Sequence, residues 1–162
     1  MKRLHVNIAV ADIEATVRFY TTLFGSEPSI RKPDYAKWML EDPRVNFAVT
    51  TRPDRKGVDH LGVQVEDGEE LSDMAAALES AGQPLIEQGE TSCCYARSRK
   101  SWVLDPDGVA WETFLTHGES PVYGSDLTPD LEGKACCIPS SARDAGPARG
   151  RGEDAQAGCG CG

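Results

Sequence analysis

The sequence predicts an α+β fold in which two βαβββ modules follow each other and together form a curved mixed sheet around a cleft. In each half, a histidine in the first predicted strand lies seven residues before an aspartate that can begin a helix: His5 precedes Asp12, and His60 precedes Asp67. Each predicted helix ends at a glycine, and an Asp-Pro dipeptide precedes the last strand of each half. Such a repeat is typical of one supersecondary module used twice.

The first module is expected to span about residues 1–52. Residues 4–11 alternate between apolar and polar side chains, which predicts a strand with one apolar face. A helix is predicted from Asp12, a suitable N-cap, to the residue before Gly25, which suits the left-handed conformation that ends many helices. Three more strands of this module are predicted at 29–31, 35–40 and 45–51.

The second module is expected to span about residues 57–122 and to repeat the same order. A strand is predicted at 58–66, followed by a helix at 69–81 that Gly82 ends. Further strand-like runs occur at 85–87, 95–98, 101–104 and 109–115. The histidine of this half lies 45 residues before its Asp-Pro dipeptide, against 37 in the first half, so the second module is longer by eight residues.

The composition indicates one globular domain, at 1–122, followed by a tail. The net charge of −9 argues against nucleic acid and anionic membranes as partners, since both attract basic surfaces. No apolar run approaches the roughly 18 residues of a membrane span, and no signal peptide is expected, so the predicted compartment is the cytoplasm. Residues 123–162 hold 8 of the 16 glycines and four of the six cysteines, and are predicted to be a disordered tail.

Three polar residues of the predicted strands form a candidate metal site. Alternation places His5 and His60 opposite the apolar row of their strands, and Glu112 on the corresponding face of the last strand. Two histidines and one carboxylate suit non-haem Fe(II) and leave metal positions open for other ligands. A lone strand histidine is more often structural, but recurrence at matched positions favours the metal role. Since the first module offers only Asn46 or Phe47 in place of Glu112, one metal site per chain is expected.

With these residues, the repeated pattern resembles the vicinal oxygen chelate superfamily, which includes glyoxalase I and the extradiol dioxygenases. Residues 58–62, residues 91–95 and the Trp111-Glu112 pair are most similar to the organoarsenical carbon–arsenic lyases and the related cadmium-induced proteins. The resemblance covers about residues 1–125. It implies an enzyme that uses Fe(II) and O2 to release arsenite from trivalent methyl and aromatic arsenicals. It also implies that His5, His60 and Glu112 hold the iron, while Cys93 and Cys94 hold the arsenic.

Adjacent cysteines in a regular strand point to opposite faces, so joint binding of arsenic by Cys93 and Cys94 requires a turn or loop. Residues 88–92 have a loop-like composition, and the eight additional residues of the second module fall nearby. The sequence therefore predicts a mobile substrate loop that closes over the metal.

Several alternatives stay open at this point. The cysteines of a protein with no enzymatic role could sequester arsenite or cadmium, and another glyoxalase- or extradiol-dioxygenase-type enzyme could use the same scaffold. The ligand set by itself also admits Mn(II), Ni(II) or Co(II), and the chain could act as a monomer or a homodimer. The role of the tail cysteines, Cys136, Cys137, Cys159 and Cys161, is open as well.

Overall fold

A computed structural model of the chain describes residues 1–53, 56–93 and 95–121. The predicted disordered tail lies outside these residues, so it stays a prediction. In the described part of the chain, neither helix is long and apolar enough to cross a membrane.

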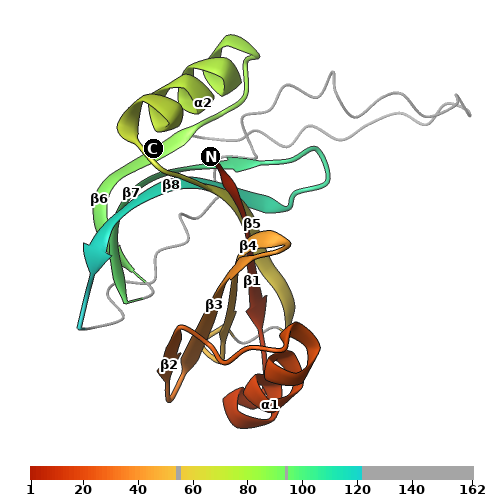
Figure 1. The fold of residues 1–162 in the computed structure, drawn as a ribbon. Coiled ribbons are helices and arrows are strands. Elements are labelled where there is room, and N and C mark those ends of the chain that lie inside the picture. The colour runs from red at the N-terminus through yellow and green to blue at the C-terminus, as the bar shows by residue number, and fades with distance from the viewer. Residues whose placement is uncertain (54–55, 94, 122–162) are drawn as a thin grey trace, which may run out of the picture. The chain divides into compact units, whose positions relative to one another are not determined.

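The described residues form two helices and eight strands in the predicted order (Figure 1). The first module consists of β1 (Arg3–Ala9), α1 (Ile13–Phe24), β2 (Ile30–Lys32), β3 (Tyr35–Glu41) and β4 (Arg44–Thr50). The second consists of β5 (Gly57–Val65), α2 (Gly68–Ser80), β6 (Ile86–Cys93), β7 (Ala96–Leu104) and β8 (Ala110–Glu119).

All eight strands belong to one mixed sheet with the order β2-β3-β4-β1-β5-β8-β7-β6. The first strands of the two modules, β1 and β5, pair antiparallel at the centre of the sheet. Each of them pairs parallel with the last strand of its own module, β1 with β4 and β5 with β8. The two modules are therefore joined by backbone hydrogen bonds between β1 and β5, and the predicted α+β fold of two βαβββ modules is confirmed.

Local sequence signals explain where α1 begins and ends. The side chain of Asp12 accepts a hydrogen bond from the backbone nitrogen of Ala15 at 3.0 Å, which satisfies one of the free amides of the first turn. Gly25 ends the helix in the left-handed conformation, with φ 66°. The apolar side chains of α1 pack on the sheet, where Trp38 is fully buried. Because α2 packs likewise against β5 and β8, the opposite face of these strands is left for other contacts.

The predicted loop at 88–92 is wrong, because these residues belong to β6. This strand pairs antiparallel with β7 from Ile86 opposite Trp102 to Cys93 opposite Ala96, with an irregularity between Glu87 and Gly89. The additional residues of the second module therefore lengthen a hairpin and do not form a loop. The loop-like composition reflects the position of β6 at the edge of the sheet, where a strand needs no apolar face.

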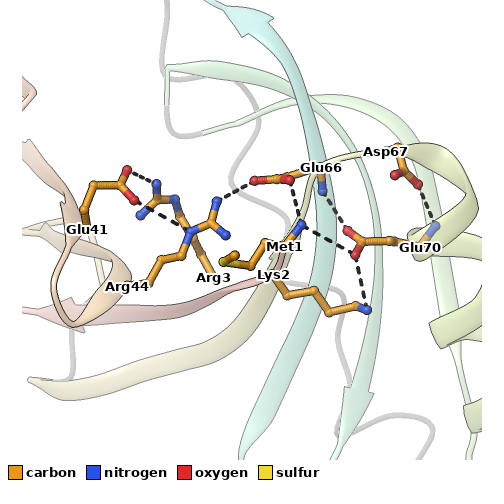
Figure 2. Close-up of polar contacts among 8 residues, drawn as sticks. All are labelled: Met1, Lys2, Arg3, Glu41, Arg44, Glu66, Asp67 and Glu70. Atoms are coloured by element: carbon orange, nitrogen blue, oxygen red, sulfur yellow. Dashed lines mark hydrogen bonds and ion pairs between the residues drawn. The ribbon is translucent and has the colours of Figure 1, made fainter.

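Exposed ion pairs connect the beginning of the chain with both modules (Figure 2). The N-terminal ammonium lies 2.6 Å from a carboxylate oxygen of Glu66, which also pairs with Arg44 of β4. Lys2 lies 3.4 Å from Glu70 of α2. Because Glu66 and Glu70 are open to solvent, which screens their charges, each pair is expected to contribute little to stability.

Candidate metal centre

Strand pairing brings the three predicted metal ligands together from distant parts of the sequence. Gly62 of β5 pairs with His5 of β1 on one side and with Glu112 of β8 on the other. His60 lies two residues before Gly62 and therefore points to the same face of the sheet. The His5, His60 and Glu112 side chains converge there, with one potential ligand atom of each within 4.8 Å of the others.

The distances between the ligand atoms fit one divalent cation. The two histidine Nε2 atoms are 3.2 Å apart, and Glu112 Oε1 lies 3.3 Å from His5 Nε2 and 3.5 Å from His60 Nε2. Ligand atoms bound at about 2.1 Å to an octahedral or tetrahedral ion lie roughly 3.0–3.4 Å from one another. All three residues are also buried, each at most 6% exposed. Two histidines and one carboxylate suit a divalent metal ion, non-haem Fe(II) among others.

Neighbouring groups orient each of the three side chains. His5 Nδ1 lies 2.9 Å from the carbonyl oxygen of Asn46, and His60 Nδ1 lies 2.8 Å from a carboxylate oxygen of Asp59. When each Nδ1 carries the hydrogen of such a contact, the Nε2 lone pair of the same ring is free to bind a metal. Glu112 accepts a hydrogen bond from Lys100 Nζ at 3.0 Å through Oε2, so that Oε1 faces the histidines.

Sequence reasoning missed Lys100. The alternation of residues 95–104 predicts two short runs with a break at 99 and 100, whereas the structure has one continuous strand, β7. In this strand Lys100 pairs with Phe114, two residues from Glu112, and it is only 7% exposed. A buried lysine needs a partner, and recognising the strand as continuous would have placed Lys100 beside the metal ligands.

The register also corrects the predicted counterpart of Glu112 in the first module. Glu112 pairs with Gly62, two residues after His60. Two residues after His5, in β1, the partner in β4 is Ala48, and not Asn46 or Phe47. The first module therefore has a methyl group where the second has a carboxylate, which agrees with the expectation of one metal site per chain.

The pKa values of the three candidate ligands are strongly shifted. Burial lowers the pKa of His5 to about 4, and the nearby charge of Glu112 opposes this only in part. Burial alone would lower the pKa of His60 too, but its hydrogen bonds to Asp59 and Glu112 outweigh burial and raise the pKa to about 9. For Glu112, burial is outweighed by the charge of Lys100 and by His60, which hold its pKa far below the usual range.

Metal binding should release about one proton per ion near pH 7.5. The pKa of His60 in the metal-free protein is about 9, so its ring is protonated at this pH, while His5, with a pKa of about 4, is neutral. An ion that binds His60 Nε2 must displace that proton, so its apparent affinity should rise about tenfold per pH unit up to about pH 9. Calorimetric titration with Co(II) in buffers of different ionisation enthalpy measures the proton count.

The matched variant for this measurement is Asp59→Asn. It removes the carboxylate that raises the pKa of His60 and should lower the number of protons released at the same pH. Equal heats in all buffers for the unmodified protein would contradict the prediction.

Replacing Lys100 by methionine should destabilise the metal-free protein by about 3 kcal/mol, because it removes the nearer of the two cations, Lys100 and the protonated His60, that face the buried Glu112 carboxylate. A bound metal ion supplies positive charge at the same carboxylate. The loss in free energy of unfolding caused by Lys100→Met should therefore be smaller in the metal-loaded protein. Urea unfolding of the metal-free and metal-loaded forms measures both effects.

The control for this prediction is Lys2→Met, which removes an exposed ion pair with Glu70 and should reduce stability far less than Lys100→Met does. If Lys100→Met and Lys2→Met lowered the free energy of unfolding by the same small amount, the buried pair of Lys100 and Glu112 would contribute no more to stability than an exposed pair.

A small cavity of about 30 Å³ borders two of the three candidate ligands, His5 and Glu112. His5, Glu112 and Lys100 line one part of it, and Tyr35 of β3 and Ala96 of β7 line another. Its volume suffices for about two water molecules, whereas a cavity that holds benzene measures about 150 Å³. The site is therefore open to small ligands on one side, and an aromatic group would require the cavity to widen.

Of the two predicted arsenic ligands, only Cys93 belongs to the described residues. Cys93 is the last residue of β6, opposite Ala96, which lines the cavity. Cys94 lies outside the described residues. Cys93 thus lies at the end of a strand whose partner Ala96 lines the cavity, and the binding of arsenic by the cysteine pair stays a prediction. His117 lies apart from the site, where its Nε2 is 3.3 Å from Glu90.

The chain is similar to a family of known proteins and to several curated relatives. The family model described as the Glyoxalase/Bleomycin resistance protein/Dioxygenase superfamily matches residues 2–113. A relative from Thermomonospora curvata named trivalent organoarsenical cleaving enzyme is 34% identical over 152 residues, which are 93% of this chain and 97% of the relative. The cadmium-induced protein CadI of Mycobacterium tuberculosis is 34% identical over 142 residues, 85% of this chain and 93% of CadI.

A solved structure shares the fold. The Mn(II)-bound glyoxalase from Novosphingobium aromaticivorans has a TM-score of 0.55 at 19% sequence identity, and the match covers 82% of this chain and 45% of the glyoxalase. At this identity the likeness concerns the fold alone. The family match and the identity to the curated relatives carry the assignment: the chain belongs to the Glyoxalase/Bleomycin resistance protein/Dioxygenase superfamily, and the organoarsenical cleaving enzymes and cadmium-induced proteins are its relatives within it.

Proposed function

We propose that this protein cleaves the carbon–arsenic bond of trivalent organoarsenicals, such as methylarsenite, in a reaction that depends on Fe(II) and O2 and releases inorganic arsenite. The observation that carries this proposal is the buried set of His5, His60 and Glu112, two of which line a small cavity, in a chain related to trivalent organoarsenical cleaving enzymes. The biological role would be detoxification of arsenic in the cytoplasm, with no nucleic acid or membrane as partner.

The residues of the chain have distinct tasks in this proposal. His5, His60 and Glu112 would hold the iron, which supplies the activation of O2. Cys93 and Cys94 would replace the two hydroxyl groups of methylarsenite by two As–S bonds, with loss of two water molecules, and orient the remaining As–C bond. Lys100 holds Oε2 of Glu112 and thereby keeps Oε1 turned toward the histidines.

The overall reaction balances without an external reductant. One methylarsenite and one O2 contain the atoms of one arsenite and one formaldehyde. The carbon of the methyl group is oxidised, O2 is reduced, and arsenic remains trivalent while its bond to carbon is replaced by a bond to oxygen. The proposal therefore predicts equal amounts of the two products.

A second candidate function is sequestration of arsenite or cadmium without catalysis. The relation to the cadmium-induced protein favours it, as does the number of cysteines in the chain. Clustered thiols bind soft metals and metalloids well. Sequestration would need the cysteines but not His5, His60 or Glu112, and this difference separates the two functions.

The deciding experiment starts from protein reconstituted with Fe(II) under anaerobic conditions. Methylarsenite and O2 are then added, and arsenite and formaldehyde are measured over many equivalents of enzyme. Multiple turnovers with equal yields of both products support carbon–arsenic cleavage. Tight binding of methylarsenite with no arsenite released would reject cleavage and favour sequestration.

Two further arms sharpen the experiment. Omission of O2 should stop arsenite release, and so should omission of Fe(II). Full activity in the absence of one of them would show that the reaction does not require it. Catechol serves as a substrate for the remaining alternative, an extradiol-type dioxygenase. If the double variant Cys93→Ser, Cys94→Ser released arsenite as fast as the unmodified protein, the proposed arsenic-binding role of the cysteines would be wrong.

A further inference from the structure

We propose that Tyr95 is a positioning residue that anchors the cysteine-bearing end of the β6–β7 hairpin to the first module at the rim of the cavity. The inference rests on the proposed function for one point only, the binding of arsenic by Cys93 and Cys94. Its structural part stands on the contacts of Tyr95 itself.

The backbone of Tyr95 has an unusual conformation for an aromatic residue. Tyr95 has φ 61°, and it is the only residue other than glycine with a positive φ among the described residues. Cys93 and Ala96 are paired, so Tyr95 lies in the short connection between β6 and β7. A bulky side chain adopts this conformation only where surrounding contacts hold it.

Those contacts come mainly from the first module. The Tyr95 hydroxyl donates a hydrogen bond to Asp34 Oδ1 at 2.9 Å, across 61 residues of sequence. The rings of Tyr95 and Tyr35 lie 5.8 Å apart, and Lys32 Nζ lies 5.2 Å from the centre of the Tyr95 ring. The Tyr95 carbonyl oxygen accepts a hydrogen bond from the backbone nitrogen of Ser120 at 2.8 Å. Both the side chain and the backbone of Tyr95 are therefore held.

The acceptor Asp34 is itself held in place. Its second carboxylate oxygen accepts a hydrogen bond from Arg52 Nε at 2.9 Å, and its carbonyl oxygen accepts one from the backbone nitrogen of Thr51 at 3.1 Å. The hydrogen bond from Tyr95 thus goes to a charged and oriented group, which makes it stronger than one between neutral groups.

The anchor lies at the rim of the cavity that adjoins the metal ligands. Tyr35 and Ala96 line this cavity, and they are the sequence neighbours of Asp34 and Tyr95 respectively. The hydrogen bond between Tyr95 and Asp34 therefore connects two segments of different modules, each of which supplies a lining residue, Tyr35 or Ala96. With this bond intact, the end of β6 that carries Cys93 is held against the first module.

The test compares Tyr95→Phe, which keeps the ring and removes the hydroxyl, with Asp34→Asn, which weakens the acceptor. Tyr20→Phe is the control, since it removes a phenol hydroxyl from α1 within the core on the helix side of the sheet. The first readout is the alkylation rate of the cysteines in the tryptic peptide 57–97, which contains only Cys93 and Cys94. The second is the steady-state kinetics of arsenite release from methylarsenite.

Loss of a hydrogen bond to a charged group should raise the alkylation rate of this peptide about tenfold in Tyr95→Phe and Asp34→Asn. The KM for methylarsenite should rise by a similar factor while kcat changes about twofold at most, and the melting temperature should stay close to that of Tyr20→Phe. If alkylation rate and KM were unchanged in both variants, or if both merely followed a lower melting temperature, the positioning role would be overturned. Failure of the unmodified protein to release arsenite would instead refute the proposed function and leave the alkylation comparison valid.

Discussion

His60→Ala is expected to abolish specific binding of divalent metal and, with it, arsenite release. The variant removes one of three ligand atoms, and His60 Nε2 is 3.2 Å from His5 Nε2 and 3.5 Å from Glu112 Oε1. Loss of a group that only orients a ligand typically costs 10–100-fold in metal affinity, so loss of the ligand itself should cost more than about 100-fold. Metal content after desalting, and activity at increasing Fe(II), measure the effect.

The matched control is His117→Ala, which removes the third histidine of the chain. The His117 side chain is 43% exposed and pairs with Glu90 on the surface, so metal content and activity should not change. If His60→Ala kept one tightly bound metal ion per chain, the assignment of the metal centre would be wrong. If it lost the metal but still cleaved methylarsenite, the metal would not take part in the reaction.

Gly62→Ala is expected to damage the site although Gly62 binds nothing itself. A Cβ atom at this position would lie 2.5 Å from the backbone oxygen of Glu112 and 2.8 Å from its Cγ atom. Contacts this short force β5 and β8 apart or turn the Glu112 side chain away. We expect a loss of stability of about 1–3 kcal/mol and, since Glu112 is displaced, a loss of metal affinity of about tenfold or more.

Urea unfolding of the metal-free protein and Co(II) titration measure the two effects separately. Gly118→Ala is the control in β8, because a Cβ atom there meets only the end of the flexible Arg97 side chain, at 3.4 Å. Its stability and metal affinity should stay close to those of the unmodified protein. If the Gly62→Ala variant bound metal as tightly as the unmodified protein, the close approach of β5 would not be what holds Glu112 in position.

Both helices could be predicted because their signals are local. Asp12 and Asp67 cap the helices through hydrogen bonds to backbone nitrogens three residues later, and these contacts depend only on nearby sequence. The central strands could be predicted for a similar reason, since one face is apolar and alternation is visible along the chain. The same alternation placed His5 and His60 opposite the apolar rows.

The β6–β7 hairpin could not be predicted in the same way. Residues 88–92 are small or polar, and they form a strand because β7 offers hydrogen-bonding partners along its whole length. Lys100 was missed because its burial depends on Glu112, which reaches it across the β7–β8 pairing. A pattern within one segment carries no information about which side chain the neighbouring strand will supply.

By itself, the sequence determined the two βαβββ modules, the limits of both helices to within one residue, and the identity of the three residues that meet at the candidate metal centre. Only the tertiary structure decided the register that sets Glu112 against Gly62, the pairing of Lys100 with Glu112, the substitution of Ala48 for a second carboxylate, and the anchoring of Tyr95 on Asp34. The physical reason is that caps and alternation act over a few neighbouring residues, whereas these contacts join residues up to 61 positions apart and form only when the sheet assembles.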